Sequence, residues 1–226
     1  MSRQRSSPGA LREHVTSMRD PVLEAEARRH YSAALPYHNF EHALAAVGHG
    51  ERLVARCREA GIDVDATVVY LALLFHDAGY EHDERALGFS SKEAYAADIA
   101  SRALSSRGFD PETIERVAAA ILSTEHGARF ECVEQKVVRA ADLAGLAADY
   151  DTFRANAEAL RTELRLLQGE DVPWPEWVRR VDARLGFYLG QDIHLTDHYF
   201  GPDGRSAFHT ALAANLARLR AEAGIG

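Results

Sequence analysis

The chain has 226 residues, of which 46% are hydrophobic and 27% charged, and its formal net charge is −8 at pH 7. A domain of this size hides roughly 70% of the surface that its unfolded chain exposes, so it needs no disulfide or metal merely to hold its fold. The acidic balance argues against a nucleic-acid polymer as a partner, because such a partner needs a basic surface.

The sequence also indicates the cellular compartment in which the protein is expected. No run of about eighteen apolar residues is present, which argues against a membrane span, and the first fifteen residues lack the apolar segment of a secretory signal. The two cysteines, Cys57 and Cys132, are far apart and are typical of buried thiols in a reducing compartment. We therefore expect a cytoplasmic protein, with residues 1–18 forming a flexible N-terminal tail.

Helix-capping signals divide the first third of the chain. Alanine and leucine dominate the sequence, which favours helices over sheets. Asp20 followed by Pro21 predicts a helix start, and the segment LPYHN ends that helix. Asn39 is the expected cap of a long helix that Gly61 closes. Asp65 opens the next helix, which is apolar nearly all round and is therefore expected at the centre of the fold.

The remaining two thirds follow the same pattern. YEHDERALGFSSK lacks periodicity and is expected to be a loop. Ser90 followed by Glu93 predicts a capping box for a helix that ends at Gly108, and Asp110 opens another helix by an Asp-Pro pair. Further helices are expected at about 133–148, 150–168, 174–190 and 207–224, with a loop at 192–206. Since no strand alternation, repeat or linker is present, we predict one all-α domain over 19–226 with about eight helices.

Polar residues interrupt the most apolar helices at four positions. His42 lies one turn inside a helix with an apolar inner face, His76 and Asp77 end the most hydrophobic helix, and Asp142 interrupts VVRAADLAGLA. A buried carboxylate without a partner costs several kcal/mol, and a divalent cation shared with two histidines removes that cost. The side chains of adjacent helical residues point about 100° apart, so His76 and Asp77 can both reach one ion only where their helix ends. Gly79 indicates that the helix ends there. Hydrogen bonding in the core would explain any one of these residues, but the ordered set favours a metal site.

The order His42, His76-Asp77, Asp142 on helices resembles the HD superfamily of metal-dependent phosphohydrolases. RRHYSAALPYHNFEHALAAV, FHDAGYEHDERALGFSSKEAYAADIA, AAAILSTEHG and RAADLAGLA are similar to a bacterial subgroup of predicted HD phosphohydrolases, and the match runs from about residue 20 to 222. The resemblance implies a helical HD-domain bundle in which these four residues hold a divalent cation (Mn, Mg, Fe, Zn or Co). It also implies a small phosphorylated substrate.

YHNFEH is also similar to the opening motif of class I cyclic-nucleotide phosphodiesterases. That likeness implies that His42 binds metal and that His38 is the general acid for the leaving oxygen. A spacing of four residues lets the two stack on one helix face if the helix begins early enough to include both. The glutamine of the phosphodiesterase purine clamp cannot be located, so a cyclic nucleotide is not implied. Asp77 is expected to orient or deprotonate the attacking water while it remains a metal ligand.

Five further residues are candidates for a second metal or for binding phosphate. His126, Lys92 and Arg85 could donate to phosphate oxygens. Alternatively, His126 could bind a second metal with His82 or Glu93, although the capping box explains Glu93 equally well.

Other charged residues have simpler explanations. A solvated helix face accounts for Arg161 and Glu163, although the resemblance makes a role at the pocket possible. His49 could flank the site, but packing accounts for it. The expected activity is hydrolysis of a small phosphate ester, with nucleotides among the candidates, by a metal-activated water. Two alternatives are a di-iron oxygenase on the same scaffold, which needs further histidines that only His82 and His126 could supply, and a non-catalytic nucleotide- or metal-binding module. The substrate and a homo-oligomeric state stay open.

Overall fold

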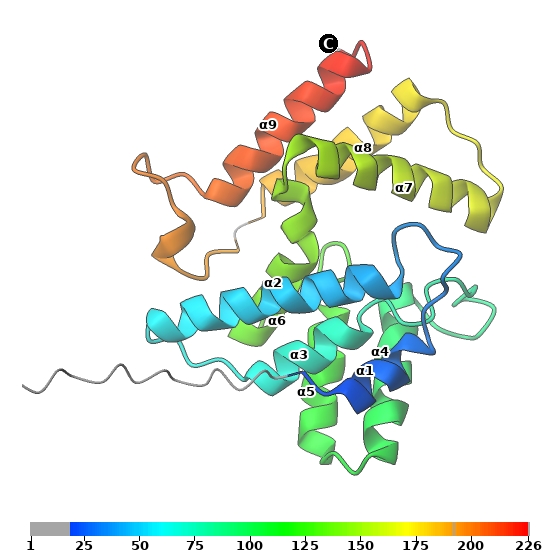
Figure 1. Cartoon of the computed structure of the whole chain (residues 1–226), viewed down its shortest axis with the longest axis vertical. Helices are drawn as coiled ribbons and strands as arrows, with labels where there is room; N and C mark the ends of the chain where they lie inside the picture. Colours follow the sequence, from blue (N-terminus) through cyan, green and yellow to red (C-terminus); the bar gives the residue numbers. More distant parts are fainter. Residues whose placement is uncertain (1–18, 192, 226) are drawn as a thin grey trace, which may run out of the picture.

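The computed structural model describes residues 19–191 and 193–225, so the predicted flexible tail, 1–18, lies outside the described residues. Within them the chain forms nine α-helices and two short 3₁₀ helices, with no strand (Figure 1). The all-α prediction is confirmed, with nine helices in place of about eight. The helices are α1 (Pro21–Arg28), α2 (Phe40–Glu59), α3 (Ala66–Phe75), α4 (Lys92–Ser106), α5 (Pro111–Leu122), α6 (Val133–Asp142), η1 (Leu143–Ala147), α7 (Tyr150–Gln168), α8 (Trp174–Leu189), η2 (Asp197–Tyr199) and α9 (Ala207–Glu222).

Most predicted helix starts are confirmed by their caps. The side chains of Asp20, Asn39, Asp65 and Asp110 each accept hydrogen bonds from backbone N–H groups in the first turn of the helix that follows. These bonds satisfy donors that a helix start otherwise leaves unpaired.

The start of α4 differs from the prediction by one residue. Ser91, not Ser90, is the cap, and its hydroxyl accepts from the N–H of Ala94 at 3.1 Å. Glu93 is therefore the second helical residue, one position short of a capping box. Two adjacent serines are equally good local caps, and the packing of α4 through buried residues such as Ala96 and Ala100 selects between them.

Several helices end earlier than periodicity predicts. The first helix ends at Arg28, α3 ends at Phe75, and α5 ends at Leu122. The predicted helix 133–148 is an α-helix only to Asp142 and continues as the 3₁₀ helix η1. Two of these ends carry candidate metal ligands, because Asp142 closes α6 and His76 follows directly after α3.

The centre of the fold is α3, as its apolar sequence predicts. Nine of its ten residues are buried, and it contacts α2, α4, α5 and α6. Helix α2 approaches it closely at Gly50, where a Cβ would collide with Leu73 and Val69 of α3. This close approach places the first turn of α2 against the end of α3.

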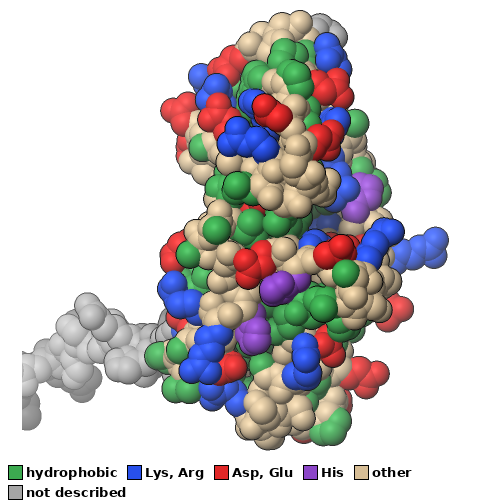
Figure 2. All heavy atoms as spheres, turned by 90° about the vertical axis from the view of Figure 1, so that its right-hand side faces the viewer, with side chains coloured by type: hydrophobic (Ala, Val, Ile, Leu, Met, Phe, Trp, Pro, Cys, Tyr) green, Lys and Arg blue, Asp and Glu red, His purple; other side chains and the backbone are tan. Residues whose placement is uncertain are grey.

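A second apolar cluster joins the last three α-helices to η1. Its buried members include Leu143, Phe153, Val178 and Leu212. Helices α7, α8 and α9 gather at one end of the molecule, and α1 to α5 lie at the other (Figure 1). The face shown in Figure 2 has acidic and basic side chains interspersed, with histidines reaching the surface among them. Among the described helices, none is both long and apolar enough to cross a membrane.

Candidate metal centre

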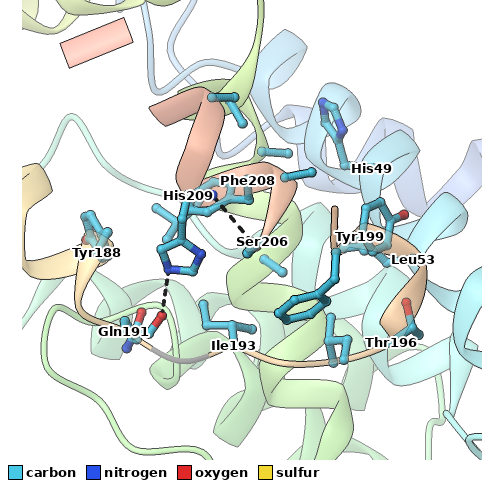
Figure 3. Close-up of a pocket in the computed structure, with 18 of the residues that line it drawn as sticks. His49, Leu53, Tyr188, Gln191, Ile193, Thr196, Tyr199, Ser206, Phe208 and His209 are labelled. Atoms are coloured by element: carbon cyan, nitrogen blue, oxygen red, sulfur yellow. Dashed lines mark hydrogen bonds between the residues drawn. The ribbon is translucent and has the colours of Figure 1, made fainter. Parts of the chain in front are cut away.

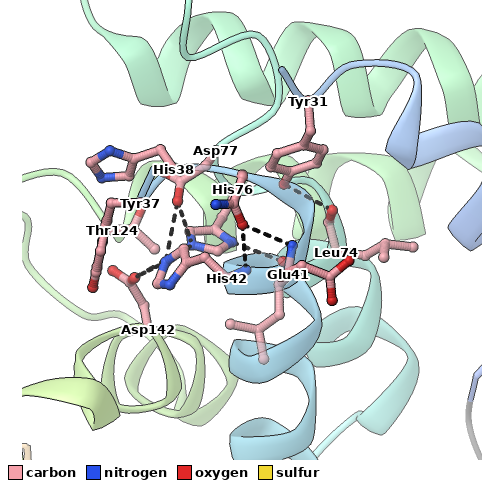
Figure 4. A network of polar contacts seen from close by, with 12 residues as sticks. Tyr31, Tyr37, His38, Glu41, His42, Leu74, His76, Asp77, Thr124 and Asp142 are labelled. Atoms are coloured by element: carbon pink, nitrogen blue, oxygen red, sulfur yellow. Dashed lines mark hydrogen bonds and ion pairs between the residues drawn. The ribbon is translucent and has the colours of Figure 1, made fainter. Parts of the chain in front are cut away.

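Four side chains from three helix ends converge on one point in the interior (Figure 4). The Nε2 atom of His76 lies 3.3 Å from His42 Nε2, 2.9 Å from Asp77 Oδ2 and 3.4 Å from Asp142 Oδ1. The Nε2 atom of His42 lies 3.3 Å from the same Asp77 oxygen and 3.4 Å from the same Asp142 oxygen. The four residues singled out in the sequence are thus brought together.

Local structure explains how each residue reaches this point. His42 is the third residue of α2, and its N–H is held by the Asn39 cap at 3.1 Å. His76 and Asp77 follow the last residue of α3, where the chain leaves the helix and two consecutive side chains turn to one side. Gly79 completes that turn with φ 76°, and a side chain there would collide with Tyr95 and Ile99.

His76 is fixed in one orientation. Its side chain is buried, with the residue only 2% exposed, and Nδ1 lies 2.8 Å from the carbonyl oxygen of Leu73. Because a carbonyl only accepts, Nδ1 must donate, and in the neutral ring Nε2 then presents its lone pair to the cluster. A backbone partner of this kind is what orients metal-binding histidines.

The two histidines of the cluster shift the protonation of the two carboxylates, and the carboxylates shift that of the histidines. Burial lowers the pKa of His42, but hydrogen bonds to Asp142 and Asp77 outweigh it and raise the pKa to about 8. Burial favours the neutral form of Asp77 and Asp142, yet the neighbouring histidines hold the pKa of both carboxyls below the usual value. Two buried carboxylates thus require two positive charges, which either two imidazolium protons or one divalent cation can supply.

The donor set fits a divalent cation. His42, His76 and Asp142 each offer one ligand atom, and these atoms lie within 4.8 Å of one another. In the described part of the chain this is the one group of three such ligands. Asp77 adds an oxygen next to both imidazoles. Two imidazole nitrogens with carboxylate oxygens suit a borderline or hard cation such as zinc, iron or manganese.

His38 stands beside the cluster, in the turn before α2. Its ring stacks on that of Tyr80, with centroids 3.6 Å apart and planes 13° apart, and its centroid is 6.1 Å from that of His42. The Nδ1 atom is hydrogen-bonded to Glu163 Oε1 of α7. The other carboxylate oxygen of Glu163 accepts from the N–H groups of His38 and Tyr37, at 3.0 and 3.2 Å.

Glu163 is a functional candidate for which the sequence pattern favours a solvated helix face. The residue is 2% exposed, so its assignment to a solvated face is wrong. It interrupts the apolar stripe of Leu160, Leu164 and Leu167, just as Asp142 interrupts its own helix, and that signal could have found it. Arg161 is half-exposed and donates to the carbonyl of Val172 at 2.7 Å, so it ties the end of α7 to the next loop.

The phosphate-binding candidates near the loop after α3 have other partners. Lys92 donates to the carbonyls of Tyr80, at 2.8 Å, and of His82, and it pairs with Glu84 at 3.0 Å. All three of its N–H donors are thus used to hold this loop. The side chains of His82 and Arg85 are exposed to solvent.

The remaining candidates also lie outside the metal-ligand group. Glu93 is half-buried, and burial with the charges of Glu125 and Asp77 raises its pKa. His126 is exposed, and its ring packs on Phe187 with centroids 4.2 Å apart. In the described residues neither joins a second group of three ligands.

A cavity of about 470 Å³ opens beside His38. One wall is the apolar stripe of α7, and the other is the loop after Tyr80, which carries acidic side chains. This volume is enough for a small molecule. The lining includes His38, Tyr80, Glu81, His82, Asp83, Glu84, Lys92, Leu160, Glu163, Leu164, Leu167, Gln168 and Trp177.

Comparison with known proteins leaves the likeness to the HD superfamily as a prediction. No protein-family model matches the chain, and no curated protein is significantly similar to it. The geometry of the four converging side chains is consequently the observation on which a functional proposal for this chain depends.

Proposed function

We propose that the chain is a metal-dependent phosphohydrolase of the HD type that cleaves a small phosphate ester, with nucleotides among its candidate substrates. The observation that carries the proposal is the convergence of His42, His76, Asp77 and Asp142 within 2.9–3.4 Å contacts. This is the ligand order that the HD motif implies, and the three helix ends that supply it are far apart in sequence.

The ligand group supports metal-assisted hydrolysis. When bound, a divalent cation supplies Lewis acidity, which polarises a phosphate oxygen and makes a nearby water more acidic. His42, His76 and Asp142 would hold the ion, and Asp77 would complete the set. The oxygens of Asp77 also suit it to orient the attacking water or to accept its proton.

His38 is suited to protonate the leaving oxygen. Glu163 accepts from Nδ1, so that Nε2 is the ring atom left to carry the proton that is transferred. The carboxylate holds the His38 ring in one orientation, and the stacked Tyr80 ring fixes its plane. Glu163 is therefore a positioning residue for His38. The cavity beside His38 gives a small leaving group space next to this donor.

The oxygenase alternative lacks comparable support. A di-iron centre needs further histidine ligands, and in the described structure His82 and His126 are exposed and lie outside the ligand group. A binding module without turnover would use the same ligands, so an activity measurement must separate it from the hydrolase.

The test is a phosphate-release screen over nucleotides and sugar phosphates with Mn²⁺, Mg²⁺, Fe²⁺, Zn²⁺ and Co²⁺. We expect hydrolysis by the wild type and none by Asp77→Ala, while Asp151→Asn, at an exposed position on α7, keeps the full rate. If metal binds but no ester is hydrolysed, the chain is a binding module. If Asp77→Ala retains the wild-type rate, the proposed mechanism is wrong.

A further inference from the structure

A second cavity lies apart from the ligand group, where residues 193–208 fold over α2 and η1 (Figure 3). Its volume is about 500 Å³, within the range of sites that hold small ligands. The walls are mainly apolar, and neither the four metal-site residues nor His38 contribute to them. Prominent apolar members are Leu53, Leu143, Ile193, Leu195, Phe200 and Phe208.

Two polar side-chain atoms in this lining are buried without a hydrogen-bond partner. Thr196 is only 5% exposed, and its hydroxyl has no partner. The Oε1 atom of Gln191 is likewise buried and unpartnered. Buried polar groups in folded proteins nearly always have partners, and leaving one unpaired is destabilising. The Thr196 hydroxyl can thus donate to an acceptor on a bound molecule, whereas the amide oxygen of Gln191 can only accept.

The guanidinium of Arg52 places a positive charge at the edge of the same cavity. Arg52 is exposed at its edge and has no carboxylate of the described residues within 4.0 Å. Its Nη2 donates to His49 Nδ1 at 2.7 Å, which holds the guanidinium against the lining.

The N-terminus of α9 adds to this charge. Ser206 caps the helix and accepts from the N–H of His209 at 3.4 Å. The N–H group of Phe208 precedes the first intrahelical bond and has no acceptor, whereas that of Ala207 faces the chain across the antiparallel bridge between Phe200 and Ser206. Among the described lining residues there is no aspartate or glutamate, although the chain carries a net charge of −8.

We infer that this cavity binds a small amphipathic carboxylate, with its apolar body between α2, η1 and the 193–200 segment and its carboxylate toward Arg52 and the start of α9. One guanidinium with the free N–H group of Phe208 balances a single negative charge, which favours a carboxylate over a phosphate dianion. The hydroxyl of Thr196 gains an acceptor. The inference is independent of the proposed hydrolysis, because the two sites share no residue.

The experiment is a calorimetric titration of the purified protein with octanoate, and in parallel with octan-1-ol, which has the same chain length without the charge. We expect one octanoate site per chain that persists when a chelator is added. Octan-1-ol should bind at least about tenfold more weakly, because it forms no charge-assisted bond to the guanidinium.

Variants locate the site. Arg52→Gln should weaken octanoate binding at least about tenfold, whereas Arg56→Gln, one turn further along α2 and outside the lining, should not. Ala144→Phe, which fills the cavity, should abolish binding, and Asp77→Ala should leave it unchanged. If Ala144→Phe fails to fold, the Arg52→Gln variant, whose substituted side chain is exposed, still tests whether octanoate binds at this cavity. The inference is overturned if octanoate does not bind the folded wild type, if it binds Arg52→Gln as tightly, or if octan-1-ol binds equally well.

Discussion

The carboxylate of Glu163 is hydrogen-bonded to the imidazole of His38, although 125 residues separate them in the chain. The same carboxylate also accepts two backbone N–H groups of the turn before α2. A single side chain of α7 therefore holds both the ring and the backbone of the candidate general acid. Through this bond α7 contributes to a site whose metal ligands come from the start of α2 and from the ends of α3 and α6.

Replacing Glu163 by Gln should separate positioning from metal binding. The amide keeps the size but cannot stabilise an imidazolium, so kcat on a hydrolysed ester should fall about 10–100-fold. Metal content should stay at the wild-type level, because Glu163 is not in the metal-ligand group. Glu158→Gln on the same helix, an exposed partner of Arg154, is the control and should change neither value.

The acid side of the stability curve should also depend on Glu163. Burial alone would raise its pKa, but the bonds from the His38 ring and the His38 and Tyr37 N–H groups outweigh burial, and the pKa lies below 4.5. The stabilising contribution is therefore fully present above about pH 4.5 and is lost as the pH falls through the folded-state pKa. Urea unfolding of wild type and Glu163→Gln should give a difference at pH 7 that shrinks towards pH 3.5. A difference that grows on acidification would contradict this assignment.

Metal analysis should give about one divalent ion per chain, since the described residues contain one group of three ligands. In Asp142→Ala the content should fall to near background. The added ion should raise the melting temperature of the wild type, because it binds only the folded form, and it should have no such effect on the variant. Stoichiometric metal in Asp142→Ala, or two ions in the wild type, would show that the ligand set is wrong.

The turn that presents His76 and Asp77 depends on Gly79. Its φ is 76°, and a Cβ would also meet Tyr95 and Ile99. Gly79→Ala should cost about 2–4 kcal/mol and weaken metal binding. Gly88→Ala is the matched control, since its φ is 90° but a Cβ there meets nothing within 4 Å. It should cost only about 1 kcal/mol. Equal losses in denaturant unfolding would mean that packing at Gly79 has no effect.

Arg139 should matter for stability although it lies outside the site. It is fully buried and donates to the carbonyls of Ser123, at 3.1 Å, and of Glu125. Arg139→Met should cost about 2–4 kcal/mol, since the buried carbonyl of Ser123 and the partly buried carbonyl of Glu125 both lose a charged donor. Lys136→Met, one turn earlier on α6 and half-exposed, should change the free energy of unfolding by less than about 0.5 kcal/mol. A loss that small for Arg139→Met would rule out a structural role.

Much of the helical framework and the metal ligands could be predicted from the sequence. An aspartate or asparagine cap acts on N–H groups two or three residues away, and Asp20, Asn39, Asp65 and Asp110 confirm that local chemistry. The cost of burying a lone carboxylate identified Asp77 and Asp142 for the same reason, because it depends only on the apolar residues around each.

The rest depends on which surfaces meet, and that is decided by tertiary packing. The partner of His38 lies on a helix 125 residues away, and the donors of Lys92 are taken up by a loop whose path no local pattern specifies. The hydroxyl of Thr196 is buried without a partner at the wall of a cavity that residues 193–208 help to enclose. Capping and periodicity act over a few residues, so they determine where helices begin and which faces are apolar. The pairing of those faces is a property of the whole core, and it alone determines that Glu163 is buried beside His38.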